Sequence, residues 1–123
     1  MKPIVTLKEV TKIYEGKVMH RALNQLNFEA LEGEFVAIMG PSGSGKTTLL
    51  NLISSIDLPT YGRVLIDNIE PENLTENNLA LFRRSNLGFV FQEINLLNML
   101  TVEENIVLPL TLDGFSIEEM EKR

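Results

Sequence analysis

The sequence predicts an α/β fold in which a small antiparallel β subdomain precedes a strand–loop–helix core. Residues 4–10 alternate apolar and polar side chains, as expected for a strand with one buried face. Residues 34–39 are almost continuously apolar, which is typical of a strand covered on both faces. A glycine-rich loop follows at residues 40–47, and apolar side chains then recur at helical spacing from Leu49 to Ile56. These three observations predict a mixed α/β domain.

The glycine-rich loop fits the phosphate-binding pattern G-x-x-x-x-G-K-S/T at every fixed position. Its residues are Gly40, Pro41, Ser42, Gly43, Ser44, Gly45, Lys46 and Thr47, followed by Thr48. Backbone N–H groups can surround a triphosphate only where the chain curls tightly without a Cβ in the way, which explains the glycines.

Lys46 would bring its charge to the β- and γ-phosphates, and Thr47 would offer a hydroxyl to Mg²⁺. The helix that starts near Thr48 would point its positive end at the phosphates. The alternative is a glycine- and serine-rich turn that matches by accident. Because a buried strand precedes the loop and a helix follows it, we predict a nucleotide-binding site with Mg²⁺. The loop alone does not separate a kinase, a GTPase and a transporter ATPase.

Before this loop the sequence predicts only strands and turns. Residues 18–31 are interpreted as a second and a third strand, with Leu23, Leu26 and Phe28 facing inward. Residues 31–34 form a turn into the strand at 34–39.

After the phosphate-loop helix, breakers at residues 57–62 predict a turn. The elements expected next are a strand at 63–67, a polar loop at 68–76, a short helix at 77–85 with Leu79, Leu81 and Phe82 inward, a buried strand at 87–91 and a loop at 92–100. A capping box beginning at Thr101 starts another helix, which Pro109 should bend or interrupt. A second capping box begins at Ser116.

The amino-acid composition excludes several classes of function. The chain has 123 residues, 44% hydrophobic and 23% charged, which suits one soluble globular domain. It contains no cysteine, so a disulfide framework, a thiolate metal site and a thiol nucleophile are excluded. The net charge of −6 argues against a general nucleic-acid binder. No apolar run approaches the length of a membrane span. The single histidine, His20, is interpreted as a spectator.

Three further segments resemble the ATP-binding-cassette (ABC) ATPases. Residues 86–92 (Asn-Leu-Gly-Phe-Val-Phe-Gln) look like the family's Q-loop strand. Residues 9–14 resemble its A-loop, and residues 58–64 resemble the segment between the phosphate-loop helix and the next strand. All three occur in the family's order around the phosphate loop, and the resemblance covers nearly the whole chain.

Later loops suggest the subgroup. The segments that look like ATPases of the macrolide-export and lipoprotein-release type are 82–84, 87–92, 95–97, 100–106 and 108–110. Within that type the chain is most similar to bacterial peptide-antibiotic (bacitracin-type) efflux and resistance ATPases.

The resemblance implies a RecA-like P-loop NTPase core with a parallel sheet. It divides the chain into an antiparallel β subdomain (1–33), the core (34–92) and the Q-loop with the start of a helical subdomain (93–123). Tyr14 would stack on adenine, for which a flat π-face is suited. Gln92 would reach Mg²⁺ and the attacking water, so Lys46 and Gln92 are the candidate catalytic residues, and Thr47 and Gln92 the candidate metal ligands. The alternative for Tyr14 is a surface aromatic at the end of a strand. The alternative for Gln92 is a polar residue that simply ends a strand.

The resemblance also implies partners. Residues from Gln92 to Leu100 would face the coupling helix of a transmembrane permease subunit, at the inner face of the cell membrane. The alternative for the apolar residues of this loop (Ile94, Leu96, Leu97 and Met99) is local core. A second ATPase subunit would complete a dimer around two ATP molecules, and no nucleic acid is expected.

Three parts of the family pattern are absent from the sequence: the Leu-Ser-Gly-Gly-Gln signature, an apolar run ending in Asp-Glu, and a histidine after it. We therefore expect an N-terminal, truncated piece of an ABC ATPase. Without the strand that carries Asp-Glu, a central strand becomes an open edge, so we expect marginal stability, a dimer or an aggregate.

The leading hypothesis is the ATPase subunit of a bacterial ABC transporter that exports antimicrobial peptides or related amphiphiles. The alternative is a nucleotide-binding piece with no turnover of its own. A small-molecule phosphotransferase would leave Tyr14, Gln92 and residues 95–110 unexplained. A cytosolic ABC protein of DNA repair or translation fits the acidic charge poorly.

Overall fold

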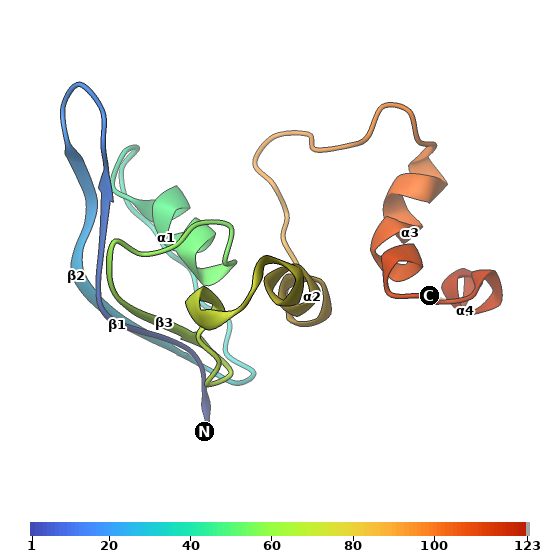
Figure 1. The fold of residues 1–123 in the computed structure, drawn as a ribbon, viewed down its shortest axis with the longest axis horizontal. Helices are drawn as coiled ribbons and strands as arrows, with labels where there is room; N and C mark the ends of the chain where they lie inside the picture. The colour runs from blue at the N-terminus through green and yellow to red at the C-terminus, as the bar shows by residue number, and fades with distance from the viewer. Residues whose placement is uncertain (123) are drawn as a thin grey trace. The chain divides into compact units, whose positions relative to one another are not determined.

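The computed structural model describes residues 1–122. The chain forms two compact units, the first comprising Met1–Arg83 and the second beginning at Arg84 (Figure 1). Each unit is described by itself below.

The first unit is built on a three-stranded antiparallel sheet. Its strands are β1 (Pro3–Tyr14), β2 (His20–Leu31) and β3 (Tyr61–Ile66), in the order β2-β1-β3. The strands expected at residues 4–10 and 63–67 are confirmed. Residues 18–31 do not form the two strands expected there, because a single long strand begins at His20.

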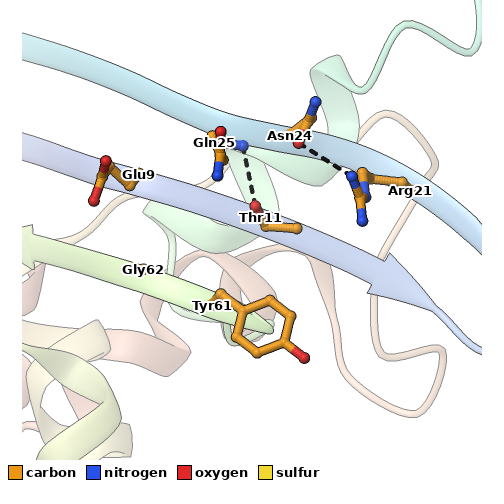
Figure 2. A pocket seen from close by; sticks show the side chains of 7 residues that line it. All are labelled: Glu9, Thr11, Arg21, Asn24, Gln25, Tyr61 and Gly62. Atoms are coloured by element: carbon orange, nitrogen blue, oxygen red, sulfur yellow. Dashed lines mark hydrogen bonds between the residues drawn. The ribbon is translucent and has the colours of Figure 1, made fainter.

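Bulges in β1 and β2 decide which side chains are buried. Strict alternation would place Leu7 and Val10 on opposite faces, yet their exposed fractions are 1% and 0%. The extra residue lies between them, at Glu9, whose φ is +48°, and the register with both neighbouring strands shifts at this point. A matching bulge at Gln25 (φ +47°) shifts β2, and the Gln25 N–H donates to Thr11 Oγ1 at 3.0 Å (Figure 2).

Helix α1 (Lys46–Ile53) supplies apolar side chains that complete the core of the first unit. The buried apolar residues are Leu7, Val10, Leu23, Leu49, Leu52, Val64, Ile66 and Phe82. The expected α1 periodicity is confirmed at Leu49 and Leu52, whereas Leu50 is exposed. Ile56 is also exposed and lies beyond the end of α1.

After β3 come the 3₁₀ helix η1 (Pro71–Asn73) and helix α2 (Glu76–Asn86). The polar loop expected at residues 68–76 therefore contains one short helical turn. Phe82 is buried as expected, but the inward orientation predicted for Leu81 is wrong, because 47% of that residue is exposed.

The strands expected at residues 34–39 and 87–91 do not form, so both predictions are wrong. Phe35 is 96% exposed and Val90 is also 96% exposed, so these segments are not buried either. A strand forms by hydrogen bonding to a neighbour. Within residues 1–122 the only strands are β1, β2 and β3, and none of them pairs with either segment.

The second unit contains α3 (Val102–Leu112) and α4 (Ile117–Glu121), and both expected capping boxes are present. Thr101 Oγ1 accepts from the Glu104 N–H at 3.1 Å, and Glu104 Oε2 accepts from the Thr101 N–H at 2.8 Å. Pro109 does not interrupt α3, which continues to Leu112. In the part of the chain that the structure describes, no helix has the length and apolarity that crossing a membrane requires.

Candidate functional site

The glycine-rich loop lies between residue 39 and α1, and its glycines adopt conformations that other residues would resist. Gly43 and Gly45 have φ values of +79° and +96°. A Cβ on Gly45 would lie 2.7 Å from the Ala22 carbonyl oxygen, and a Cβ on Gly40 would lie 2.8 Å from Ser44 Oγ. The loop therefore approaches β2 closely and folds tightly on itself, as the sequence pattern requires.

Lys46 is the first residue of α1, and its ammonium group closes the loop. Lys46 Nζ donates to the carbonyl oxygens of Gly40 and Pro41, each at 2.7 Å, and lies 3.3 Å from Ser44 Oγ. These partners are neutral dipoles, so the positive charge is held in place without a carboxylate to neutralise it. A phosphate group would provide a stronger partner at the same position.

The N-terminal end of α1 is suited to an anion. Its first turn carries no acidic side chain, and its N-cap residue, Gly45, provides no side-chain hydrogen bond to the helix. The first N–H groups of a helix have no partner within it and carry the positive end of its dipole. Thr47 is exposed and Thr48 is partly exposed at this end. The N-terminal end of α1 thus brings together backbone N–H groups, the Lys46 ammonium and the Thr47 hydroxyl.

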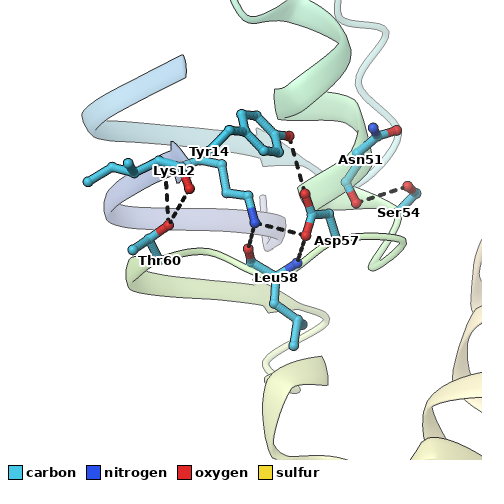
Figure 3. Close-up of polar contacts among 8 residues, drawn as sticks. Lys12, Tyr14, Asn51, Ser54, Asp57, Leu58 and Thr60 are labelled. Atoms are coloured by element: carbon cyan, nitrogen blue, oxygen red, sulfur yellow. Dashed lines mark hydrogen bonds and ion pairs between the residues drawn. The ribbon is translucent and has the colours of Figure 1, made fainter. Parts of the chain in front are cut away.

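Tyr14 lies at the end of β1 and is 39% exposed (Figure 3). Its hydroxyl donates to Asp57 Oδ2 at 3.2 Å. Lys12 Nζ donates to Asp57 Oδ1 at 2.9 Å and to the Leu58 carbonyl oxygen at 2.8 Å. The same ammonium lies 5.2 Å from the centroid of the Tyr14 ring. The ring is therefore held at its hydroxyl and on one face.

The Asp57 carboxyl is ionised within this group of residues. Burial raises the pKa of Asp57, but hydrogen bonds from Lys12, the Leu58 N–H and Tyr14, together with the Lys12 charge, more than offset that effect. The net result is a pKa below the ordinary value of 3.8. Asp57 can therefore serve as an acceptor for both neighbours at neutral pH.

Gln92 belongs to the second unit and is exposed, in a bend directly after Phe91. The loop that follows is shaped by Asn105 of α3. Its Nδ2 donates to the carbonyl oxygens of Leu97 and Thr101 at 3.2 and 2.9 Å, and its Oδ1 accepts from the Leu97 N–H at 2.9 Å. Leucines of this loop and apolar residues of α3 line an open hollow: Leu96, Leu97, Leu100, Val102 and Ile106.

Protein side chains alone do not build a metal centre. Among residues 1–122, no group of three or more His, Cys, Asp or Glu side chains is placed to hold an ion. A Mg²⁺ ion would rely on the Thr47 hydroxyl and on phosphate oxygens of the nucleotide, as Mg²⁺ commonly does.

Comparison with known proteins identifies the family of the chain. The ABC transporter family model matches residues 23–123. The chain belongs to the ABC transporter family. It resembles the ATP-binding proteins of that family. Its relatives include a bacitracin export ATP-binding protein, as the expected bacitracin-type subgroup predicts.

Two relatives illustrate the similarity. The ABC transporter ATP-binding protein YxdL of Bacillus subtilis is 52% identical over 123 residues, which are 100% of this chain and 48% of that protein. The bacitracin export ATP-binding protein BceA of Halalkalibacterium halodurans is 48% identical over 110 residues, 89% of this chain and 44% of that protein. The chain spans about half the length of the curated relatives it matches.

A solved structure shares the fold. The dimeric ATP-binding cassette MJ0796, in a post-hydrolysis state bound to ADP and Pi, superposes with a TM-score of 0.88 at 49% identity. The match covers 96% of this chain and 53% of that one. The expected fold class, an ABC ATPase cassette with an N-terminal antiparallel β subdomain, is thereby confirmed.

The sequence predicted the glycine-rich loop but not the contacts among Lys12, Tyr14 and Asp57. Residues two apart on a strand share a face, so the spacing of Lys12 and Tyr14 was an available signal. Asp57 is 45 residues from Lys12, and no local pattern pairs them.

Proposed function

We propose that this chain is the ATP-binding part of an ABC transporter subunit and binds ATP with Mg²⁺ at residues 40–48. The observation that carries the proposal is the position of Lys46 Nζ, held by two carbonyl oxygens of the loop at the N-terminal end of α1. Phosphate oxygens would take the place of these carbonyl groups. The backbone N–H groups of the loop, including those of Ser42, Gly43 and Gly45, would surround the phosphates.

Other residues complete the proposed site. Tyr14 would stack on the adenine ring, and Thr47 would bind Mg²⁺. Gln92 would be a second ligand of that ion and would orient the attacking water. Mg²⁺ would offset the negative charge of the phosphates and favour transfer of the terminal phosphoryl group to water.

We further propose that the protein couples ATP binding and hydrolysis to export of antimicrobial peptides or related amphiphiles. The BceA relative supports this substrate class. In this proposal the protein lies in the cytoplasm, peripheral on the inner face of the membrane. It forms a dimer with a second ATPase subunit, as the relative MJ0796 does.

The permease would dock on residues 92–100. The apolar side chains of this loop support the proposal, since Ile94 is 91% exposed and Met99 is 92% exposed. The Asn105 hydrogen bonds hold the second half of the loop in a defined shape. Exposed apolar residues on a shaped loop are typical of a protein–protein contact.

ATP binding and ATP turnover measured on the same purified sample test the proposal, with Lys46→Ala as the control. Binding that requires Lys46 is the expected result, and binding that survives Lys46→Ala would contradict it. Turnover that depends on Lys46 would assign hydrolysis to this chain. Binding without turnover would favour the second candidate, a nucleotide-binding chain with no turnover of its own.

A further inference from the structure

The Tyr14 ring is fixed from two directions by the same ion pair. Asp57 accepts the Tyr14 hydroxyl, and Lys12 places its ammonium over one ring face at 5.2 Å. Lys12 in turn is anchored by Asp57 Oδ1 and the Leu58 carbonyl oxygen (Figure 3). The Lys12 side chain is 13% exposed and the Asp57 side chain is 32% exposed, so this ion pair is partly buried.

The contact leaves the ring available on its other side. A cation over one face of an aromatic ring restricts how the ring can rotate and occupies that face. Tyr14 nevertheless keeps 39% of its surface exposed. A planar ligand can therefore stack on the uncovered face without displacing Lys12.

Asp57 also connects Tyr14 to the helix of the phosphate loop. The N–H groups of Ile56 and Asp57 both donate to the Asn51 carbonyl oxygen of α1, at 3.0 and 3.1 Å. The same helix carries Lys46 and Thr47 at its other end. The Tyr14 hydroxyl is thus tied, through one side chain and one turn, to the element that holds the phosphate site.

We propose that Lys12 and Asp57 are positioning residues that hold the Tyr14 ring for the base of a bound nucleotide. This inference rests on the proposed function, since it assumes that a nucleotide occupies residues 40–48. Neither residue touches the nucleotide. They restrict rotation of the Tyr14 side chain before binding, so that less conformational entropy is lost when the base stacks on the ring.

The positioning role can be separated from a merely structural one by comparing a ligand that carries a nucleotide base with a ligand that lacks it. Affinities of the 123-residue chain for ATP and for inorganic tripolyphosphate, both with Mg²⁺, are measured by titration calorimetry. The variants are Tyr14→Phe, Asp57→Asn and Lys12→Met.

We expect each variant to lose about threefold to tenfold in ATP affinity, the effect of roughly one hydrogen bond. Affinity for tripolyphosphate should stay unchanged. The double variant Tyr14→Phe/Asp57→Asn should lose no more than Asp57→Asn alone, because the hydrogen bond that Tyr14→Phe removes is the one that Asp57 accepts.

Two matched controls are available, one in β3 and one directly after it. Tyr61→Phe removes the hydroxyl of the other tyrosine, which is 66% exposed. Asp67→Asn breaks the Lys2–Asp67 ion pair, whose atoms lie 2.5 Å apart. Neither control should change the affinity for ATP. Circular dichroism of every variant verifies that the fold is retained.

ATP affinity that is unchanged in Tyr14→Phe and Asp57→Asn would overturn the inference. Equal losses for ATP and tripolyphosphate would also overturn it, since they would mean that the ion pair only supports the fold. Failure of the proposed function is distinguishable, because the unmodified chain would then bind neither ligand, or would bind both independently of Lys46.

Discussion

Strand β1 and the segment at residues 34–39 are both rich in apolar side chains, but only one of them is covered. Leu7 and Val10 in β1 are 1% and 0% exposed, whereas Phe35 and Met39 are 96% and 89% exposed. The difference is in their neighbours. β1 lies between β2 and β3 and hydrogen-bonds to both, while residues 34–39 pair with no strand of the described chain. An apolar run therefore shows what needs to be covered, and the available neighbours decide whether it is.

Replacing a buried β1 side chain should give the largest effect. Leu7→Ala leaves a cavity in the core of the first unit, and we expect it to lower the free energy of unfolding by about 2–5 kcal/mol. Urea unfolding followed by circular dichroism measures this change. The matched control is Phe35→Ala, which should stay within about 0.5 kcal/mol of the unmodified chain. Equal losses in the two variants would show that residues 34–39 are as well covered as β1.

The bulge that lets Leu7 and Val10 share a face depends on a close contact with β3. Gly62 has φ +87°, and a Cβ there would lie 2.4 Å from the Glu9 carbonyl oxygen. Gly62→Ala should therefore lower the free energy of unfolding by about 2–3 kcal/mol, from backbone strain and from the clash together.

Gly33→Ala serves as the control for Gly62→Ala. Gly33 has φ +78° but nothing within 4 Å of its Cβ position, so we expect a loss of only about 1 kcal/mol in urea unfolding. If Gly62→Ala lowered the free energy of unfolding by no more than Gly33→Ala does, the close approach of β3 to the bulge would not contribute to the effect.

The phosphate loop could be predicted from the sequence because its geometry is local. Eight consecutive residues carry the glycines, the lysine and the hydroxyl, and the positive φ values of Gly43 and Gly45 follow from the same stretch. The capping boxes at Thr101 and Ser116 are predictable for the same reason.

Features that depend on distant residues could not be predicted. The bulges at Glu9 and Gln25 break the alternation from which the strand was inferred, and the second is held by a hydroxyl 14 residues away. The pairing of Lys12 with Asp57 spans 45 residues. The exposure of residues 34–39 and 87–91 likewise depends on which strands are present to pair with them, and no local pattern contains that information.

Replacing an exposed residue of the segment at 34–39 should have the smallest effect on the free energy of unfolding. It should have a clear effect on self-association. Phe35→Ser should change the free energy of unfolding by less than about 0.5 kcal/mol, because the side chain is 96% exposed. It should also reduce self-association, since an uncovered apolar segment without a strand partner favours contact with another chain. Sedimentation velocity at several concentrations measures the change in the oligomer fraction.

Val18→Ser is the matched control, because Val18 is 83% exposed in the turn between β1 and β2 rather than in the apolar segment. If exposed apolar area alone drove association, the two variants would reduce it equally. A larger effect of Phe35→Ser would assign association to residues 34–39. A chain that remains monomeric at all concentrations and unfolds in one sharp, reversible transition would contradict the expectation, because the segment would then tolerate water without needing a partner.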